Sequence, residues 1–209
     1  MRKISLFRRL THSALSNIEL NGLVLDLGGE NRSEYQHLFQ GSYKVYTVNI
    51  NEDVRPDIVF DLEEASLPVE DASYDHVLLI NVLEHIYNYR QLIEESVRVL
   101  KPRGTVIVIV PFLMSVHPSP HDYFRYTRDA LEKLCDDAGL QNIEVIGLGA
   151  GTFSASYNLK HRFYPSPIHI VFEKIAFISN WLVRTSAQLL NKKYDGSEYP
   201  LGYMVIARK

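Results

Sequence analysis

The sequence of 209 residues has little that would place it among disulfide-linked, membrane-spanning or nucleic-acid-binding proteins. A single cysteine, Cys135, excludes an internal disulfide framework. No apolar run reaches the roughly 18 residues that a membrane span needs, and the run at 106–110 stops at Pro111. The net charge of −3 lacks the basic excess typical of nucleic-acid binding, and Arg8 and Arg9 interrupt the place of a signal peptide's apolar centre. We therefore expect a cytoplasmic protein with no nucleic-acid partner.

Short β-rich runs alternate with helical patterns from residue 23 onward. This alternation is typical of a mostly parallel sheet with helices on both faces, and an apolar content of 46% suffices for one such core. We therefore predict an α/β fold in a single domain, residues 1–209. The seven predicted strands are 23–27, 44–49, 57–60, 76–80, 105–110, 143–146 and 203–207.

Two helices can be placed between these strands. Apolar residues recur near helical spacing over 83–100, and the Lys-Pro-Arg-Gly run at 101–104 is expected to end that helix. Thr127 is the predicted N-cap of a later helix, and Gly139 is its predicted C-terminal stop. The apolar stripe of this second helix comprises Ala130, Leu131, Leu134 and Ala138.

Two segments fall outside the alternation, namely an N-terminal helical segment at 1–20 and an insertion at 151–197 before the last strand. Apolar residues at helical spacing over 168–182 predict that the insertion is a helical cap. Because such stripes usually face a protein core, we expect both segments to pack against the sheet as a substrate lid. Basic residues beside the apolar ones leave peripheral membrane contact as the alternative. They are Arg2, Lys3, Arg8, Arg9, Lys174 and Arg184.

The most informative motif is VLDLGGE at 24–30, an apolar strand that runs through an acidic residue into paired glycines. Glycine has no Cβ and tolerates positive φ, so Gly28 and Gly29 would let a ligand approach the backbone closely. An ordinary strand-to-helix turn has the same pattern. Polar residues after the later strands favour a site for a small charged cofactor.

Polar residues stand at the end of, or directly after, three further predicted strands. The carboxyl ends of parallel strands meet at one edge of a sheet, where open α/β sheets bind ligands. Nucleotide sites of this kind usually position a polar side chain after the second strand for the ribose hydroxyls. These positions, which together predict one crevice, are Asn49-Ile50, Asp61-Leu62 and Asn81-Val82.

Four stretches together resemble the class I S-adenosylmethionine-dependent methyltransferases, and within them the methyltransferase type 11 group. They are VLDLGG, FDLEEASLPVEDASYDHVLLINVLEHI, RVLKPRGTVIVIVP and HPSPHDYFRYTRDALEKLCDDAGL, within residues 22–147. The resemblance implies a Rossmann-like seven-stranded sheet whose last strand, 203–207, runs antiparallel to the others. It also implies S-adenosylmethionine as the cofactor.

The resemblance implies a position around the cofactor for each residue of the predicted crevice, whereas Asp75 is expected to belong to the entry of the strand at 76–80. The cofactor residues are Asp26, Gly28 and Gly29 at the amino-acid part, Asn49 and Ile50 at the ribose, Asp61 and Leu62 at the adenine, and Asn81 and Val82 at the methionine portion.

The segment 116–126 combines titratable, aromatic and proline residues on a predicted active-site loop. His121 is the first candidate for a general base that would remove a proton from a hydroxyl acceptor. Asp122 would orient His121, and Tyr123 or Arg125 would contact the acceptor. The alternative is that these side chains form a hydrogen-bond network that only fixes the loop.

Two other features of the histidines bear on chemistry. His85 is a second candidate base because the resemblance places it beside the cofactor, although its alternative role is to anchor the helix that follows. His117 and His121 are four residues apart, but the prolines between them argue against a helical metal face. We therefore expect no metal.

The favoured function is methyl transfer to a small-molecule or glycan acceptor, such as a sugar or glycolipid. Glu30 and Asn49 stand where the type 11 group often has a glycine and an acidic residue, which leaves a non-catalytic binding protein of the same fold as an alternative. A macromolecule methyltransferase is disfavoured because residues 81–84 do not form an NPPY-like motif. The pattern does not define the acceptor atom or the oligomeric state.

Overall fold

The structure is a computed structural model that describes residues 4–30, 33–64, 66–149, 151–165, 168–190, 192, 194 and 197–209. Seven strands form one sheet in the order β3-β2-β1-β4-β5-β7-β6. All neighbouring pairs are parallel except those of β7, which is antiparallel to β5 and β6. The strands are β1 Gly22–Leu27, β2 Tyr43–Asn49, β3 Ile58–Val59, β4 Tyr74–Ile80, β5 Leu100–Pro111, β6 Gln141–Leu148 and β7 Gly202–Arg208. The predicted fold class, including the antiparallel last strand, is confirmed.

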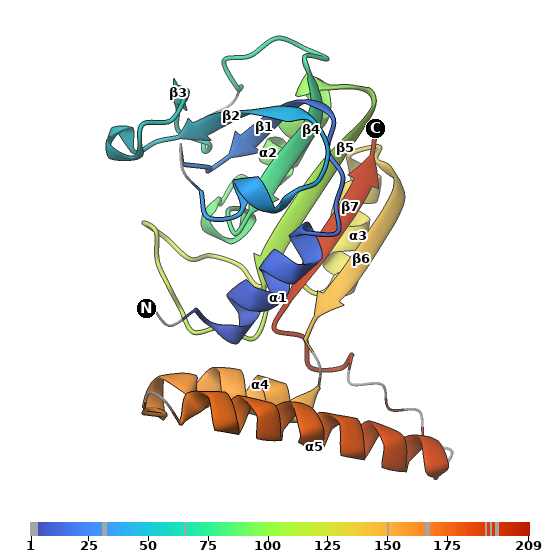
Figure 1. Ribbon diagram of the computed structural model, residues 1–209. Coiled ribbons are helices and arrows are strands. Elements are labelled where there is room, and N and C mark those ends of the chain that lie inside the picture. Colours follow the sequence, from blue (N-terminus) through green and yellow to red (C-terminus); the bar gives the residue numbers. More distant parts are fainter. Residues whose placement is uncertain are drawn as a thin grey trace.

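Helices cover both faces of the sheet (Figure 1). The helices α2, Tyr89–Val99, and α3, Arg128–Asp137, pack on one face, and α1, Leu6–Leu15, packs on the other. Alternate residues of one strand point to opposite faces of the sheet. Val108 of β5 therefore packs in the core under α2 and α3, and Ile107 packs in the core under α1. Because both faces are buried, the central strands read as continuous apolar runs rather than as an apolar–polar alternation.

The insertion before β7 is helical, as predicted. Its helices α4, Thr152–Lys160, and α5, His169–Leu189, form a hairpin that Figure 1 shows apart from the sheet and below α1. An ion pair between Arg9 and Glu173 joins α1 to α5. Among the described residues, no helix combines the length and the apolar content that crossing a membrane requires.

The helix predicted over 83–100 begins later than expected. Residues Leu83–His85 form a short 3-10 turn, η3, and α2 starts only at Tyr89. The Glu63 carboxylate accepts the backbone N–H groups of Tyr87 at 2.6 Å and Asn88 at 3.1 Å. This side chain, from a distant connection, holds the backbone just before α2 and leaves the preceding turn free to line a cavity.

The structure confirms the predicted ends of α3 and the predicted role of Asp75, whereas the predictions for Ala130 and for the start of β5 are wrong. Thr127 caps α3 by accepting the N–H of Ala130, and Gly139 follows that helix with a φ of 78°. Asp75 accepts the N–H of Leu23 at 2.8 Å, as expected for a strand-entry residue. Ala130 is exposed rather than part of the core. The strand β5 begins at Leu100, because a register shift against β4 accommodates residues 101–104 within the strand.

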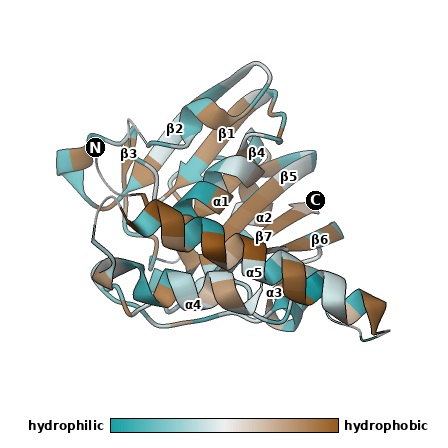
Figure 2. Cartoon of the chain, turned by 60° about the horizontal axis from the view of Figure 1, so that its bottom comes forward, coloured by the Kyte–Doolittle hydropathy of each residue, from teal (hydrophilic) through white to brown (hydrophobic). Residues whose placement is uncertain are grey.

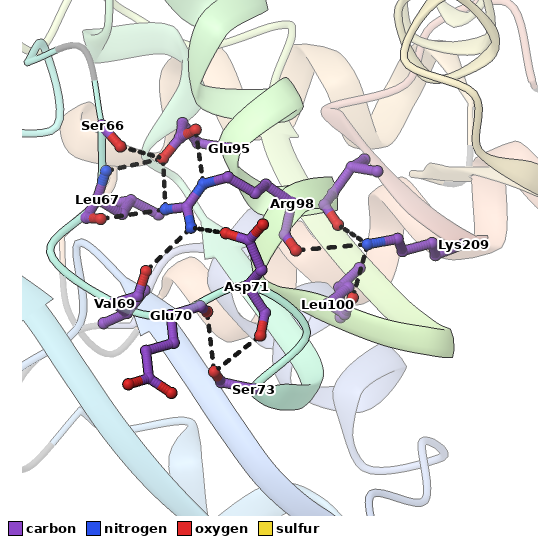
Figure 3. Close-up of polar contacts among 11 residues, drawn as sticks. Ser66, Leu67, Val69, Glu70, Asp71, Ser73, Glu95, Arg98, Leu100 and Lys209 are labelled. Atoms are coloured by element: carbon purple, nitrogen blue, oxygen red, sulfur yellow. Dashed lines mark hydrogen bonds and ion pairs between the residues drawn. The ribbon is translucent and has the colours of Figure 1, made fainter.

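A polar network fastens α2 to the connection that precedes β4 (Figure 3). The Arg98 guanidinium donates to the Glu95 and Asp71 carboxylates and to the carbonyl oxygens of Leu67 at 3.1 Å and Val69 at 3.0 Å. One side chain therefore satisfies two loop carbonyls and two carboxylates, which makes it a support of this part of the fold.

Arg98→Ala is expected to lower the free energy of unfolding by about 2 kcal/mol or more, because it leaves partly buried acceptors without their charged donor. Arg90→Ala is the matched control on the same helix, since its ion pair with Asp137 is 3.8 Å long and exposed. The control should change stability by less than about 0.5 kcal/mol. Urea unfolding measures both, and equal effects would contradict the role of the network.

Candidate active site

A cavity of about 760 Å³ lies at the carboxyl ends of β1, β2 and β4. This volume is within the range of small-molecule sites, and the position is the switch point at which open parallel sheets bind ligands. The cavity wall contains most of the residues predicted to surround a cofactor. They are Gly28, Asn49, Ile50, Asp61, Leu62, Asn81 and Val82.

The paired glycines are required by close packing. A Cβ at Gly28 would lie 2.4 Å from Cγ2 of Val82, and the φ of Gly28 is +80°. A Cβ at Gly29 would lie 2.3 Å from Oδ2 of Asp26. Any larger residue would therefore displace either the cavity wall or the buried carboxylate behind it.

Asp26 lies behind the glycine turn, fully buried, and is not part of the described cavity wall. Its carboxylate accepts the Tyr35 hydroxyl at 3.0 Å and the Gln36 amide at 3.1 Å. Burial raises the pKa of this carboxyl to about 7. Asp26 therefore holds the segment after the turn through its hydrogen bonds with Tyr35 and Gln36. Its contact with a cofactor stays a prediction.

Asn49 has a structural reason to be an amide. Its Nδ2 donates to the carbonyl oxygens of Gly28 at 3.0 Å and Gly29 at 3.2 Å, and its Oδ1 accepts the N–H of Asn51 at 2.9 Å. A carboxylate would have no hydrogen to donate to these carbonyls. The residue that departs from the type 11 pattern therefore fixes the turn it faces, and its contact with a ribose stays a prediction.

A second cavity, of about 510 Å³, adjoins the first and lies between α1 and the segment after β5. Gly28, Glu30, Asn81, His85 and Ser119 line both cavities. The wall on the α1 side includes Arg8 and His12. The sequence predicted α1 as part of a lid but identified none of its polar residues as site residues. These polar residues recur at helical spacing, and apolar residues occupy the other side of the same helix. This pattern could have identified the polar side of α1 as a cavity wall.

The loop after β5 is fixed to η3 by four hydrogen bonds. The Glu84 carbonyl accepts the N–H groups of Tyr123 at 2.8 Å and Phe124 at 3.3 Å, and the Tyr126 hydroxyl donates to the Leu83 carbonyl at 3.1 Å. The fourth bond joins Nδ1 of His85 to the His121 carbonyl at 2.5 Å. The loop is therefore held against both cavities.

The contacts of the Asp122 carboxylate join it to Arg125 and His117. It pairs with Arg125 through contacts of 2.5 and 2.7 Å and accepts the N–H of His117 at 2.9 Å. The Arg125 guanidinium holds the pKa of Asp122 well below its usual range. This arrangement corresponds to the loop-fixing network that the sequence left as the alternative, and Asp122 does not orient His121 as expected.

His121 and Tyr123 both line the first cavity, with their ring centroids 5.3 Å apart. His85 lines both cavities, and its Nδ1 also bonds to the His121 carbonyl in the loop after β5 rather than anchoring the helix that follows it. A general-base role for either histidine, and acceptor contacts of Tyr123 and Arg125, stay predictions.

Comparisons of this chain with protein families and with curated proteins both find similarity to methyltransferases. Residues 25–108 match a family described as "Methyltransferase domain". A "Probable S-adenosylmethionine-dependent methyltransferase" of Mycolicibacterium smegmatis is 32% identical over 104 residues, which cover 46% of this chain and 40% of the relative. Norajmaline N-methyltransferase of Rauvolfia serpentina is 29% identical over 84 residues, covering 40% of this chain and 29% of the relative.

Among solved structures, a SAM-dependent methyltransferase of Archaeoglobus fulgidus aligns with a TM-score of 0.58 at 16% identity, covering 98% of this chain and 93% of that protein. This likeness concerns the fold. The chain matches two fifths or less of the length of the two curated relatives, so the similarity does not extend over the whole of those proteins.

Asp26→Asn is expected to change the pH dependence of stability. The raised pKa means that the folded state keeps the proton between pH 3.8, the usual pKa, and about 7. The stability that the bound proton contributes is therefore complete below pH 3.8 and is lost as the pH rises from 3.8 to about 7. The free energy of unfolding falls by about 1.4 kcal/mol per pH unit in this range. The wild type should lose stability relative to the variant over that range in urea unfolding. Parallel pH profiles would show that Asp26 does not titrate in this window.

Proposed function

We propose that the chain transfers a methyl group from S-adenosylmethionine to a small-molecule acceptor, because residues 25–108 match a methyltransferase family and the chain is similar to S-adenosylmethionine-dependent methyltransferases. Sugars and glycolipids are the first candidates for the acceptor. The observation that carries this proposal is the pair of adjoining cavities, which share Gly28, Glu30, Asn81, His85 and Ser119 on their walls.

The first cavity suits the donor. The Gly28 turn leaves backbone without a side chain at the wall, which permits the close approach that a nucleoside with an amino-acid tail requires. Apolar side chains of Ile50, Leu62 and Val82 provide surfaces for a planar base, and Asp61 adds a carboxylate. A ligand with an apolar ring and positive groups matches this combination.

The second cavity suits an acceptor with several polar groups. Its wall includes Arg8 and His12 from α1 and Glu34 from the connection after β1, and Arg8 pairs with Glu34 at 3.2 Å. These side chains supply both donors and acceptors of hydrogen bonds, as recognition of a polyhydroxylated molecule requires.

Alignment is the main contribution that the chain would make to the reaction. The sulfonium of the donor supplies an already activated methyl group. The residues shared by the two walls would bring the two reactants together, and such orientation can contribute about 7–11 kcal/mol to lowering the barrier. Norajmaline N-methyltransferase, a relative, is named for a small-molecule reaction, which supports an acceptor of that class.

Contact of the α4–α5 hairpin with an anionic lipid surface is a further part of the proposal. Figure 2 shows hydrophobic residues along α5, and Val171, Ile175, Ile178 and Leu182 are exposed at helical spacing. The sole acidic residue of α5, Glu173, is paired with Arg9, whereas Lys174 and Arg184 are exposed. Apolar area with a positive rim suits the headgroup region of an anionic membrane, where a glycolipid acceptor would be found.

Calorimetric titration with S-adenosylmethionine tests the donor site. The wild type should bind at micromolar concentration. Gly28→Ala should weaken binding by about tenfold or more, because the Cβ and the positive φ of Gly28 together force the turn to move. Gly147→Ala is the matched control, since its Cβ meets nothing closer than 3.8 Å. Absence of binding by the wild type would favour the non-catalytic alternative.

Tryptophan fluorescence tests the lipid contact, because the single tryptophan, Trp181, lies exposed on α5. Vesicles of phosphatidylglycerol should shift its emission to the blue, and vesicles of phosphatidylcholine should not. Ile178→Asp should abolish the shift, whereas Gln141→Asp, which adds the same charge on β6, should preserve it. An unchanged emission of the wild type with both lipids contradicts the contact.

A further inference from the structure

The Glu84 side chain is buried in a way that calls for a positive partner. It is 0% exposed, and neither carboxylate oxygen has a hydrogen-bond partner among the residues that the structure describes. Burying a carboxylate without compensation costs several kcal/mol or more, so such groups are paired or bind metals. The groups that face this carboxylate therefore indicate what occupies the space beside it.

Two histidine rings face Glu84, and each is held by a backbone carbonyl on its far side. Nδ1 of His85 lies 2.5 Å from the His121 carbonyl oxygen, and Nδ1 of His117 lies 2.9 Å from the Ser115 carbonyl oxygen. A carbonyl only accepts, so Nδ1 carries the hydrogen in both rings. In the neutral rings, Nε2 then presents a lone pair, and it is Nε2 of each ring that faces Glu84.

The distances favour a shared ion over direct hydrogen bonds. Oε1 of Glu84 lies 3.6 Å from Nε2 of His85 and 3.7 Å from Nε2 of His117. Both distances exceed those of N–H···O hydrogen bonds. Two ligand atoms of one tetrahedral zinc lie about 3.4 Å apart, since each is about 2.1 Å from the metal. All three ligand atoms lie within 4.8 Å of one another.

We propose that Glu84, His85 and His117 bind a divalent metal ion of the zinc type. Two imidazoles and one carboxylate are a ligand set that zinc uses in catalytic sites, where a further position stays open. The two backbone carbonyls act as the outer partners that orient metal-bound histidines. The nearby Arg125 charge is neutralised by its pairing with Asp122, which itself lies 3.5 Å from Nδ1 of His117.

The open side of this ligand set faces the candidate acceptor site, because His85 lines both cavities and His117 lines the second. On the proposed methyltransferase function, the ion would bind an acceptor hydroxyl and lower its pKa, so that its proton leaves to solvent before the oxygen takes the methyl group. No metal was expected from the sequence because spacing along the chain relates His117 only to His121. The fold instead brings His117 to Glu84 and His85.

Zinc titration of the EDTA-treated full chain by calorimetry tests the site. One Zn²⁺ per chain should bind with a Kd in the micromolar range or below. Glu84→Gln, which keeps the size of the side chain, and His117→Ala should each weaken binding by about 100-fold or more, because loss of an outer partner alone typically costs about 10- to 100-fold. Replacement of zinc by Co²⁺ should give the visible absorption of a four-coordinate site in the wild type only.

Glu34→Gln and His12→Ala serve as matched controls, since both residues line the second cavity outside the ligand set. They should bind zinc as the wild type does. Absence of zinc binding by the wild type, or equal binding by Glu84→Gln, overturns the metal site. A parallel titration with S-adenosylmethionine keeps the two proposals separate, because zinc binding without donor binding overturns only the methyltransferase function.

Discussion

The parallel pairing of β1 with β2 on one side and β4 on the other is the constraint on which the site depends. It brings the carboxyl ends of three strands to one edge, so that Gly28, Asn49 and Asn81 line one cavity. The antiparallel β7 extends the same edge. A Cβ at its Gly202 would lie 2.3 Å from the Phe7 ring, so α1 can pack there only because this residue is glycine. The second cavity follows from that packing.

Local sequence signals were sufficient to predict the sheet and the residues that line the first cavity. Each buried strand is a short apolar run bounded by turn residues, which is why all seven were predicted with errors mainly at their ends. The paired glycines and the polar residues after the strands located the first cavity for the same reason. Thr127 and Gly139 marked the limits of α3 because caps act on their own backbone neighbours.

Contacts between distant segments account for what the sequence missed. The start of α2 depends on Glu63, and the direction of the Asp122 carboxylate depends on Arg125 and His117. The ligand set proposed for a metal joins η3 to the loop after β5, two segments that spacing along the chain does not relate. A hydrogen bond between those segments fixes the tautomer of His85, and one within the loop fixes that of His117; periodicity contains no information about either.

The cavity beside Gly28 is proposed as the site for S-adenosylmethionine, next to an acceptor cavity, and the other functional proposals depend on this assignment. A crystal structure of the complex with S-adenosylhomocysteine tests the assignment most directly. We expect the amino-acid part at the Gly28 turn, the ribose beside Asn49 and the sulfur directed to the wall shared with the second cavity. Binding at any other surface, or a cavity that stays empty at saturating ligand, would contradict it.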